Sequence, residues 1–453
     1  MSMTVKLKKG LDIRLIGEAE KVTANAPHSD YYAVKPADFH GMTPKMLVKA
    51  GDKVKAGTVI FFDKYNEQIK YASPVSGEVT EIVRGEKRRI LEVRIKADEQ
   101  IVFESASPAD PSSMSAEEVK QRILDSGLWP MLKQRPLDVV ANPNNKPKAI
   151  YISAFDSAPL APDYDYVLHG QGAHFQKGLD ALTKLTEGKV YLGLNGSVRH
   201  DDAFTNATGV VTNQFVGKHP VGNVGTQIHH TNPINKNEFV WVINPQDVMI
   251  IGRYFAEGKF DLTKLIALTG SEVKSPKYYR VINGASIKSF VAGLLNEGNN
   301  RIISGNVLTG TKVDENGFIG FYDNHISVIP EGNEMKFFLT KGWLSLGFDK
   351  FSNSRLFPTY LTPGKKFRLD TNTNGEERGF VVTGELEKVF PFDIYPMQLI
   401  KAAMTEDIDL MENLGIYEVA PEDFALCEYV CTSKIEIQDE IRKGLDLIQK
   451  ECF

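Results

Sequence analysis

Residues 45–79 constrain the fold of this chain more than any other part of the sequence. They contain a turn at Gly51 and Asp52, a second glycine at Gly57, a short apolar strand, and the segment SPVSG followed by Glu78 and Val79. Glycine marks such turns because it adopts backbone angles that are closed to other residues. We therefore predict two strand-turn units that fold back on each other in a small β unit.

This layout resembles the barrel-sandwich domains of biotinyl and lipoyl carrier proteins, in which a modified lysine occupies the tip of the hairpin between the two units. The expected tip is residues 64–68, and the carrier pattern would place its lysine near Glu67. Lys64 and Lys70 are expected on the two flanks of the hairpin. The fold of a carrier is therefore predicted without the residue that carriers modify.

Length and composition exclude several classes of protein. A chain of 453 residues is too long for one core, so about two to four domains are expected. The net charge of −5 gives no reason to expect a nucleic-acid partner. The longest apolar run, residues 239–255, is interrupted by Asn-Pro-Gln-Asp and by Arg253, so no membrane span is predicted. The N-terminus has no apolar core typical of a secretory signal, and three cysteines form no disulfide framework. A cytoplasmic protein is expected, with any membrane contact made through a partner.

Pattern changes along the chain predict a multidomain protein of α/β and β architecture. The predicted units are a barrel-sandwich domain over residues 1–104, a Rossmann-like α/β domain over 105–257, a β-grasp (SLBB-like) domain over 258–330, and a mixed segment leading to a C-terminal helical domain over 331–453.

Local signals support these units. Ser115 followed by Glu118 predicts a helix start, and that helix is expected to stop at Gly127. Residues 148–154 and 189–194 are expected to be buried strands, separated by a helix over residues 175–185. A strand over 278–282 and a helix over 285–295 belong to the predicted β-grasp unit, and residues 435–448 are expected to form a closing amphipathic helix.

Cys427 and Cys431 are the first candidates for chemistry, because a spacing of four residues places two thiols on one face of a helix. An iron–sulfur cluster usually needs four thiolates, and the only other cysteine is Cys452. Structural thiols are therefore favoured over a metal site.

Two glycine-rich segments are candidates for phosphate sites. The turn from His219 through Gly222 to Gly225, ahead of the pair His229 and His230, matches neither the P-loop nor the dinucleotide fingerprint. A tight interdomain loop is favoured over an anion site. The segment at Gly170 and Gly172 is interpreted as an ordinary loop before a helix, because its third glycine comes several residues late.

Aromatic and apolar residues in two expected loops form the last candidate site. They suggest either a slot for a flat apolar ligand or a docking surface for another protein of a complex, and a core or interface role is favoured over a ligand site. The candidate residues are Tyr32, Phe39 and His40 before the first strand-turn unit, and Trp129, Met131 and Lys133 after the first helix.

Taken together, four segments resemble the NqrA family, the A subunits of the bacterial sodium-translocating NADH:quinone oxidoreductases, over nearly the full length of the chain. They are KGLDI at residues 9–13, SPVSGEV at 73–79 with Arg84 and Gly85, HPVGNVGTQIH at 219–229, and ISGNVLTG at 303–310. The domain order is more distantly similar to the C subunit of the Rnf complex and to the flavin-carrying subunit of complex I.

Those distant relatives hold flavin phosphate on a loop written G-x-G-G-A-G-F-P. At the equivalent place this chain has WPMLKQRP, residues 129–136, and without glycines the backbone cannot approach a phosphate closely. The relatives' cysteine-rich cluster motifs are reduced here to Cys427 and Cys431. No FMN, NADH or iron–sulfur binding and no metal site is therefore expected in this chain, and no catalytic residue is assigned.

The resemblance implies a peripheral subunit on the cytoplasmic side of the bacterial inner membrane, docked on the membrane-embedded B subunit. The complex would pass electrons from NADH through FMN, FAD and a 2Fe–2S centre in other subunits to quinone, while exporting Na⁺. Quinone contact at the aromatic candidates and a purely structural role are both open. The alternatives are a non-catalytic adaptor, modified on Lys64 or Lys70, and a flavin-dependent NADH dehydrogenase subunit.

Overall fold

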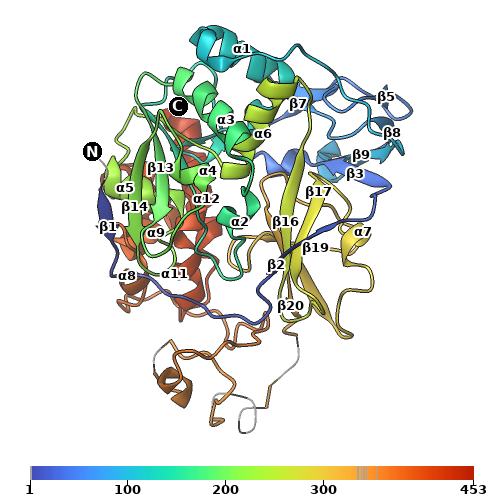
Figure 1. The fold of residues 1–453 in the computed structure, drawn as a ribbon. Coiled ribbons are helices and arrows are strands. Elements are labelled where there is room, and N and C mark those ends of the chain that lie inside the picture. The colour runs from blue at the N-terminus through green and yellow to red at the C-terminus, as the bar shows by residue number, and fades with distance from the viewer. Residues whose placement is uncertain (1–2, 334–335, 338, 340–341, 343, 354) are drawn as a thin grey trace.

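The computed structural model describes residues 3–333, 336–337, 339, 342, 344–353 and 355–453. Four sheets and a group of C-terminal helices make up this part of the chain, and the barrel, α/β and β-grasp units meet around one large hydrophobic core. Figure 1 shows the barrel strands in blue, the α/β unit in green, the β-grasp strands in yellow and the C-terminal helices in red. The predicted combination of a barrel-sandwich domain with mixed α/β units is confirmed.

Two facing sheets form the barrel-sandwich unit. One has the order β3 (Tyr31–Val34), β9 (Ile90–Ala97), β8 (Gly77–Arg84) and β5 (Lys53–Val54), and the other β4 (Pro44–Met46), β6 (Val59–Asp63) and β7 (Asn66–Ala72). Gly77 is required where β8 passes β9, because a Cβ there would lie 1.9 Å from the carbonyl oxygen of Lys96. The glycine-punctuated pattern therefore produces the predicted unit.

The tip of the β6–β7 hairpin differs from the prediction. Asp63 pairs with Asn66 across the hairpin, so the turn consists only of Lys64 and Tyr65, and Glu67 lies within β7. The Asp63 carboxylate accepts a hydrogen bond of 3.3 Å from the Tyr65 N–H, which closes a shorter turn than expected. The expected position of Lys64 on the flank is wrong, since this lysine lies in the turn itself.

The α/β unit contains a seven-stranded sheet flanked by helices. Its strand order is β1 (Thr4–Lys6), β14 (Val211–Val216), β13 (Lys189–Asn195), β12 (Ala149–Ser153), β15 (Val240–Val242), β10 (Lys133–Arg135) and β11 (Val139–Val140). The helices are α1 (Ala116–Ser126), α2 (Tyr164–Val167), α3 (Gly172–Lys184), α4 (Asp202–Thr205), α5 (Val224–Thr231) and α6 (Pro245–Glu257), with a single 3₁₀ turn, η4 (Trp129–Met131), after α1.

Both faces of this sheet are covered. Ile150 and Ile152 of β12 belong to the same core cluster as Leu179 of α3, whereas Tyr151 packs in a separate cluster with Ile228 of α5. Successive strand residues point to opposite faces, so a buried run without polar alternation is what a sheet covered on both sides requires. The predicted strands are confirmed, and the α3 helix begins three residues earlier than expected.

The predicted helix boundaries around α1 are confirmed in atomic detail. The Ser115 hydroxyl accepts from the Glu118 N–H, the Glu118 carboxylate accepts from the Ser115 N–H at 2.8 Å, and Gly127 ends the helix in the left-handed conformation. These contacts satisfy backbone groups that a helix end leaves without partners. Such local patterns are predictable because every partner lies within a few residues.

The β-grasp unit is a six-stranded sheet with one short helix. The order is β19 (Thr311–Val313), β18 (Asn300–Ser304), β20 (His325–Pro330), β16 (Thr263–Thr269), β17 (Lys277–Ile282) and β2 (Glu20–Asn25). The expected helix over 285–295 is reduced to α7 (Lys288–Val291), because the backbone leaves the helical conformation at Ala292 and turns at Gly293, which has a φ of 73°.

The N-terminal residues contribute to sheets outside the barrel. β1 pairs in parallel with β14 of the α/β unit, and β2 pairs in parallel with β17 of the β-grasp unit. Figure 1 shows this blue segment running from one unit to the other. The boundaries at 104, 257 and 330 remain predictions, with these two strands assigned to sheets other than the barrel.

The C-terminal region has a core of its own. Its helices are α8 (Leu386–Val389), α9 (Pro396–Met404), α10 (Ile408–Asn413), α11 (Ala425–Val430) and α12 (Ile437–Cys452), and their apolar faces form a second cluster that includes Ile400, Met411 and Ile448. Between β20 and α8, the only helix or strand in the described residues is the 3₁₀ turn η5 (Pro358–Leu361). Across the part of the chain that the structure describes, no helix is long and apolar enough to cross a membrane.

Candidate functional site

A cleft of about 230 Å³ opens at the carboxyl ends of β12 and β15. The chain passes from β12 to β13 and β14 on one side, then returns to place β15 on the other side of β12. In open parallel sheets such a reversal of strand order leaves a crevice where ligands bind. The cleft is the candidate site of this chain, and its lining at this edge consists of Ser153 at the end of β12, Phe155 and Asp156 after it, and Ile243 to Pro245 after β15.

Three other parts of the molecule complete its walls. The chain between η4 and β11 contributes one wall, the β-grasp unit a second, and the C-terminal region a third. The lining residues from these parts are Met131, Lys133, Arg135 and Asp138, then Asn306, Leu308, Thr309 and Tyr322, and finally Glu422. The site is therefore assembled from segments almost 300 residues apart.

A neutral histidine lies in one wall of the cleft. His219 Nδ1 lies 3.0 Å from the Ser157 hydroxyl, and that hydroxyl accepts a hydrogen bond of 2.8 Å from the Gly222 N–H. The imidazole is 4% exposed, and burial lowers the pKa of His219 to about 4. His219 is uncharged at neutral pH and contributes hydrogen bonds, not a positive charge, to this wall.

The cations that line the cleft are paired within the chain. Arg135 is 1% exposed and contacts Asp423 at 2.6 Å and Glu422 at 2.5 Å, whereas Lys133 contacts Asp138 at 2.6 Å. A phosphate entering the cleft would have to displace these carboxylates or approach them against charge repulsion. The lining therefore favours a ligand without a phosphate group.

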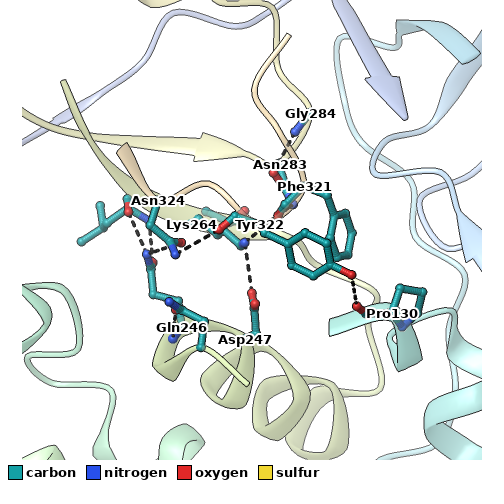
Figure 2. A network of polar contacts seen from close by, with 12 residues as sticks. Pro130, Gln246, Asp247, Lys264, Asn283, Gly284, Phe321, Tyr322 and Asn324 are labelled. Atoms are coloured by element: carbon teal, nitrogen blue, oxygen red, sulfur yellow. Dashed lines mark hydrogen bonds and ion pairs between the residues drawn. The ribbon is translucent and has the colours of Figure 1, made fainter. Parts of the chain in front are cut away.

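A network of polar contacts holds the β-grasp unit against α6 (Figure 2). Gln246 donates to the backbone oxygen of Leu265 and to Asn324, and the buried Lys264 ammonium lies 3.0 Å from Asp247. The Tyr322 hydroxyl donates a hydrogen bond of 2.7 Å to the Pro130 oxygen, which ties the β-grasp unit to η4. These contacts fix the relative positions of three walls of the cleft.

The structure separates the six residues predicted from the sequence into three places. Met131 and Lys133 line the cleft. Tyr32, Phe39 and Trp129 are 4%, 2% and 0% exposed and belong to the main core. His40 lies on the surface with Asp446 Oδ1 at 2.7 Å from its Nε2.

The buried aromatic candidates have intramolecular partners. Phe39 packs edge-on against Phe321 with ring centroids 4.8 Å apart, and Trp129 makes a similar contact with Trp241 at 5.3 Å. The Trp129 indole N–H donates a hydrogen bond of 2.7 Å to the Ala141 oxygen. The cavity beside Phe39 measures only about 20 Å³, which is too small for a ring.

The glycine-rich turn near His219 is explained by close packing. A Cβ on Gly225 would lie 2.3 Å from Arg135 Nη1 and 2.4 Å from Asp423 Oδ1, so glycine leaves room for that ion pair. His229 of α5 then contacts Glu418 at 2.7 Å. Both contacts join the α/β unit to the C-terminal region, as expected for an interdomain loop.

The cysteines lie in the C-terminal helices. Cys427 is in α11 and Cys431 at its end, both buried in the second core, and burial raises the pKa of the Cys427 thiol. Across the described ranges, no group of three or more His, Cys, Asp and Glu side chains could hold a metal ion. These thiols occupy core positions.

Sequence reasoning missed most of the cleft. Ser153 and Asn244 each come at the end of a buried strand, and carboxyl ends of parallel strands meet at one edge of a sheet. That signal identifies them from sequence once the strands are predicted. No such local signal identifies Tyr322 and Glu422 as lining residues, because they belong to the β-grasp unit and the C-terminal region.

Burial of His219 predicts a pH dependence of stability. Between about pH 6.5 and 4 the unfolded state binds a proton that the folded state excludes, so stability falls as the pH falls. From pH 6.5 to about pH 5 the wild-type chain should lose about 2 kcal/mol more than the His219→Asn variant. Urea unfolding at both pH values measures this difference.

The exposed His169 offers a matched control. Its hydrogen bond to Asp201 raises the pKa of His169. The His169→Asn variant should therefore lose as much stability on acidification as the wild-type chain does. Equal pH dependence in the wild-type and His219→Asn chains would contradict a neutral, buried His219.

Comparison with known proteins gives the same family in every part of the chain that a model matches. Residues 5–98 match the family model described as NqrA N-terminal barrel-sandwich hybrid domain, residues 114–260 the NqrA second alpha/beta domain, and residues 265–315 the NQRA C-terminal domain.

Full-length relatives belong to the same family. The A subunit of the Na(+)-translocating NADH-quinone reductase of Marinomonas sp. (strain MWYL1) is 39% identical over 449 residues, covering 98% of this chain and 99% of the relative. The corresponding protein of Hahella chejuensis is 37% identical over 450 residues, covering 99% and 100%. Among solved structures, an NAD⁺-reducing [NiFe]-hydrogenase aligns with 14% identity and a TM-score of 0.35 over 50% of this chain and 49% of that one.

Proposed function

The chain belongs to the NqrA family, the A subunits of the Na(+)-translocating NADH-quinone reductases, and on this premise we propose that it is the peripheral cytoplasmic subunit of that complex, docked on the membrane-embedded B subunit, and carries no redox cofactor of its own. The relatives are named as subunits of a translocating enzyme, which supports a role exercised only in the assembled complex. FMN, FAD and the 2Fe–2S centre are assigned to other subunits.

The observation that carries the proposed lack of a flavin is the structure of residues 129–136. Pro130 has no N–H, its carbonyl accepts the Tyr322 hydroxyl, and the Trp129 ring fills the adjacent core. Arg135, which would be the nearest buried cation for a phosphate, is held by Asp423 and Glu422. A phosphate-binding loop needs free N–H groups and a backbone that the phosphate can approach.

Quinone contact at the cleft is a second candidate role. Met131 and Lys133 lie in its lining beside Phe155, Ile243 and Leu308, and the polar groups of Asn223, Asn244 and Thr309 accompany them. These apolar side chains and neutral hydrogen-bonding groups suit an uncharged ring with carbonyl oxygens, although the lining also contains the ion pairs of Lys133 and Arg135. In this role the chain would position quinone, while the electrons come from cofactors elsewhere in the complex.

Affinity purification of the tagged chain from gently solubilised membranes of its own source tests the main proposal. We expect several membrane subunits to co-elute with Na⁺-stimulated NADH:quinone reductase activity. The chain purified alone should be colourless and inactive, with an intact mass equal to that of the unmodified sequence. A monomer without partners would contradict the proposal, and a flavin absorbance band would contradict the lack of a cofactor.

A photoreactive quinone tests the second role in the assembled complex. Labelling of the peptide that contains Met131 and Lys133 is expected, with competition by excess unlabelled quinone. Labelling restricted to other subunits would leave this chain with a structural role.

A further inference from the structure

The segment that joins the β-grasp unit to the C-terminal helices exposes large apolar side chains at an unusual density. Such residues are normally scattered singly over a protein surface, and a cluster of them indicates an interaction site. They include Leu344 at 50%, Leu346 at 74%, Phe348 at 62%, Leu356 at 73% and Leu361 at 67%.

The same segment is strongly basic. Residues 336–369 contain seven lysines and arginines and one acidic residue, Asp349, although the whole chain carries a net charge of −5. Lys336, Lys366 and Arg368 pair with carboxylates elsewhere in the molecule. These pairs neutralise three of the seven cations, and the other four still outnumber Asp349, the one acidic residue of the segment.

Three of its cations have no acidic partner among the described residues. Lys350 and Lys365 donate to the backbone oxygens of Gly342 and Phe348, and Arg355 is exposed. All three lie within a few residues of the exposed leucines. The basic groups without an acidic partner are thus interspersed with the exposed apolar residues along the segment.

The segment lies at one end of the molecule. Figure 1 shows it in orange and brown, extending beyond the β-grasp strands and the C-terminal helices, with the barrel at the far end. Among the described residues of the segment, η5 is the only helix or strand, and it carries Leu361 and Tyr360, which is 48% exposed. The segment therefore lies at an end of the molecule away from the barrel strands.

We propose that this segment binds directly to an anionic lipid surface, with the leucines and Phe348 entering the headgroup region and Lys350, Arg355 and Lys365 contacting lipid phosphates. Apolar groups flanked by basic ones are the combination that binds anionic membranes. Basic charge fits lipid phosphates better than the cytoplasmic loops of a membrane protein, because those loops are themselves enriched in Lys and Arg. The inference rests on the proposed peripheral placement for its biological setting.

Sedimentation with vesicles tests the proposal on the purified full-length chain. We expect binding to vesicles of phosphatidylglycerol and phosphatidylcholine in equal parts, no binding to phosphatidylcholine alone, and weakening by salt. Each basic group near an anionic surface contributes about fivefold to binding, so Lys350→Glu, Arg355→Glu and Lys365→Glu together should weaken it on the order of a hundredfold. Leu344→Ser, Leu346→Ser and Phe348→Ser together should weaken it at least as much.

Matched controls carry the same changes elsewhere on the surface. Lys146→Glu, Lys189→Glu and Lys288→Glu reverse three exposed lysines, and Leu47→Ser, Val102→Ser and Val198→Ser remove three exposed apolar groups. The vesicle affinity of both control chains should lie within about twofold of that of the wild-type chain. For the lysine control, the comparison is made after correction for its more negative net charge. Unchanged thermal unfolding of each segment variant shows that a loss of binding is not a loss of folding.

The outcomes separate this proposal from the proposed function. Vesicle binding that is lost in the segment variants supports direct lipid contact, whether or not other subunits co-purify. A wild-type chain that ignores every vesicle overturns it. If the wild-type chain does not bind vesicles and the segment variants fail to co-purify with membrane subunits that the wild-type chain recovers, the surface binds protein instead, while complex membership stands.

Discussion

Replacing Arg135 by methionine is expected to destabilise the folded chain by about 3–5 kcal/mol, because the change leaves buried carboxylates without their cation. Asp423 is completely buried and lies 2.6 Å from the guanidinium, whereas the Glu422 side chain is 42% exposed and can be hydrated. Most of the expected loss therefore comes from Asp423. Urea unfolding of the purified chain measures it.

The pH dependence of that loss has a defined sign. Burial raises the pKa of Asp423 even with Arg135 present, and removing the guanidinium raises this pKa further. A carboxyl group with a raised folded pKa is stabilising when protonated and loses that contribution as the pH rises through its folded pKa. The Arg135→Met chain should therefore be more destabilised relative to wild type at neutral pH than at about pH 4, near the ordinary pKa of an unfolded aspartate.

A matched surface substitution calibrates the Arg135 experiment. Lys146 pairs with Glu187 at 2.9 Å, but both side chains are 86% exposed. Lys146→Met should change the stability by less than about 1 kcal/mol. An Arg135→Met chain that behaves like this control would contradict the role of Arg135 in joining the α/β unit to the C-terminal region.

Replacing Lys264 by methionine is expected to cost a similar amount, about 3–5 kcal/mol. The Lys264 and Asp247 side chains are 0% and 1% exposed and 3.0 Å apart, in the network that Figure 2 shows between β16 and α6. Desolvation raises the pKa of Asp247, and Lys264 opposes that shift. Without the ammonium, Asp247 must be buried alone or take up a proton.

The double variant Lys264→Met with Asp247→Leu tests whether the charge itself is responsible. Replacing both members of a buried pair by apolar groups is often neutral, so most of the stability lost in the single variant should return. A double variant as unstable as the single one would mean that packing of the lysine stem, or its hydrogen bond to the Phe321 oxygen, carries the effect. Urea unfolding of the wild-type chain, the Lys264→Met and Asp247→Leu single variants and the double variant completes the cycle.

Local features of this protein could be predicted from the order of its residues. The α1 helix follows from Ser115, Glu118 and Gly127, because each capping contact joins residues within a few positions. The strands β12 and β13 follow from apolar runs that only a doubly covered sheet can bury. The glycines that allow β-strands to pass closely, such as Gly77, likewise indicate the barrel.

The residues of the candidate site could be predicted only in part from local sequence patterns. Met131 and Lys133 are candidates from the sequence that do line the cleft, but Trp129, two residues before Met131, is fully buried against Trp241. Neighbours in a loop point in different directions, and only the packing of the surrounding units decides which faces a cavity. Aromatic residues between elements are therefore a weak guide to a ligand site.

The kinds of element, the barrel unit and the family could be predicted from the sequence, because they depend on turn residues, periodicity and short motifs. The tertiary structure alone decided that β1 and β2 join distant sheets, and that Glu422 closes the cleft beside Arg135. Strand pairing and the burial of charge here join segments that are hundreds of residues apart in the sequence. The energies of these interactions depend on which strands and charged residues come into contact, and no local sequence pattern identifies those partners.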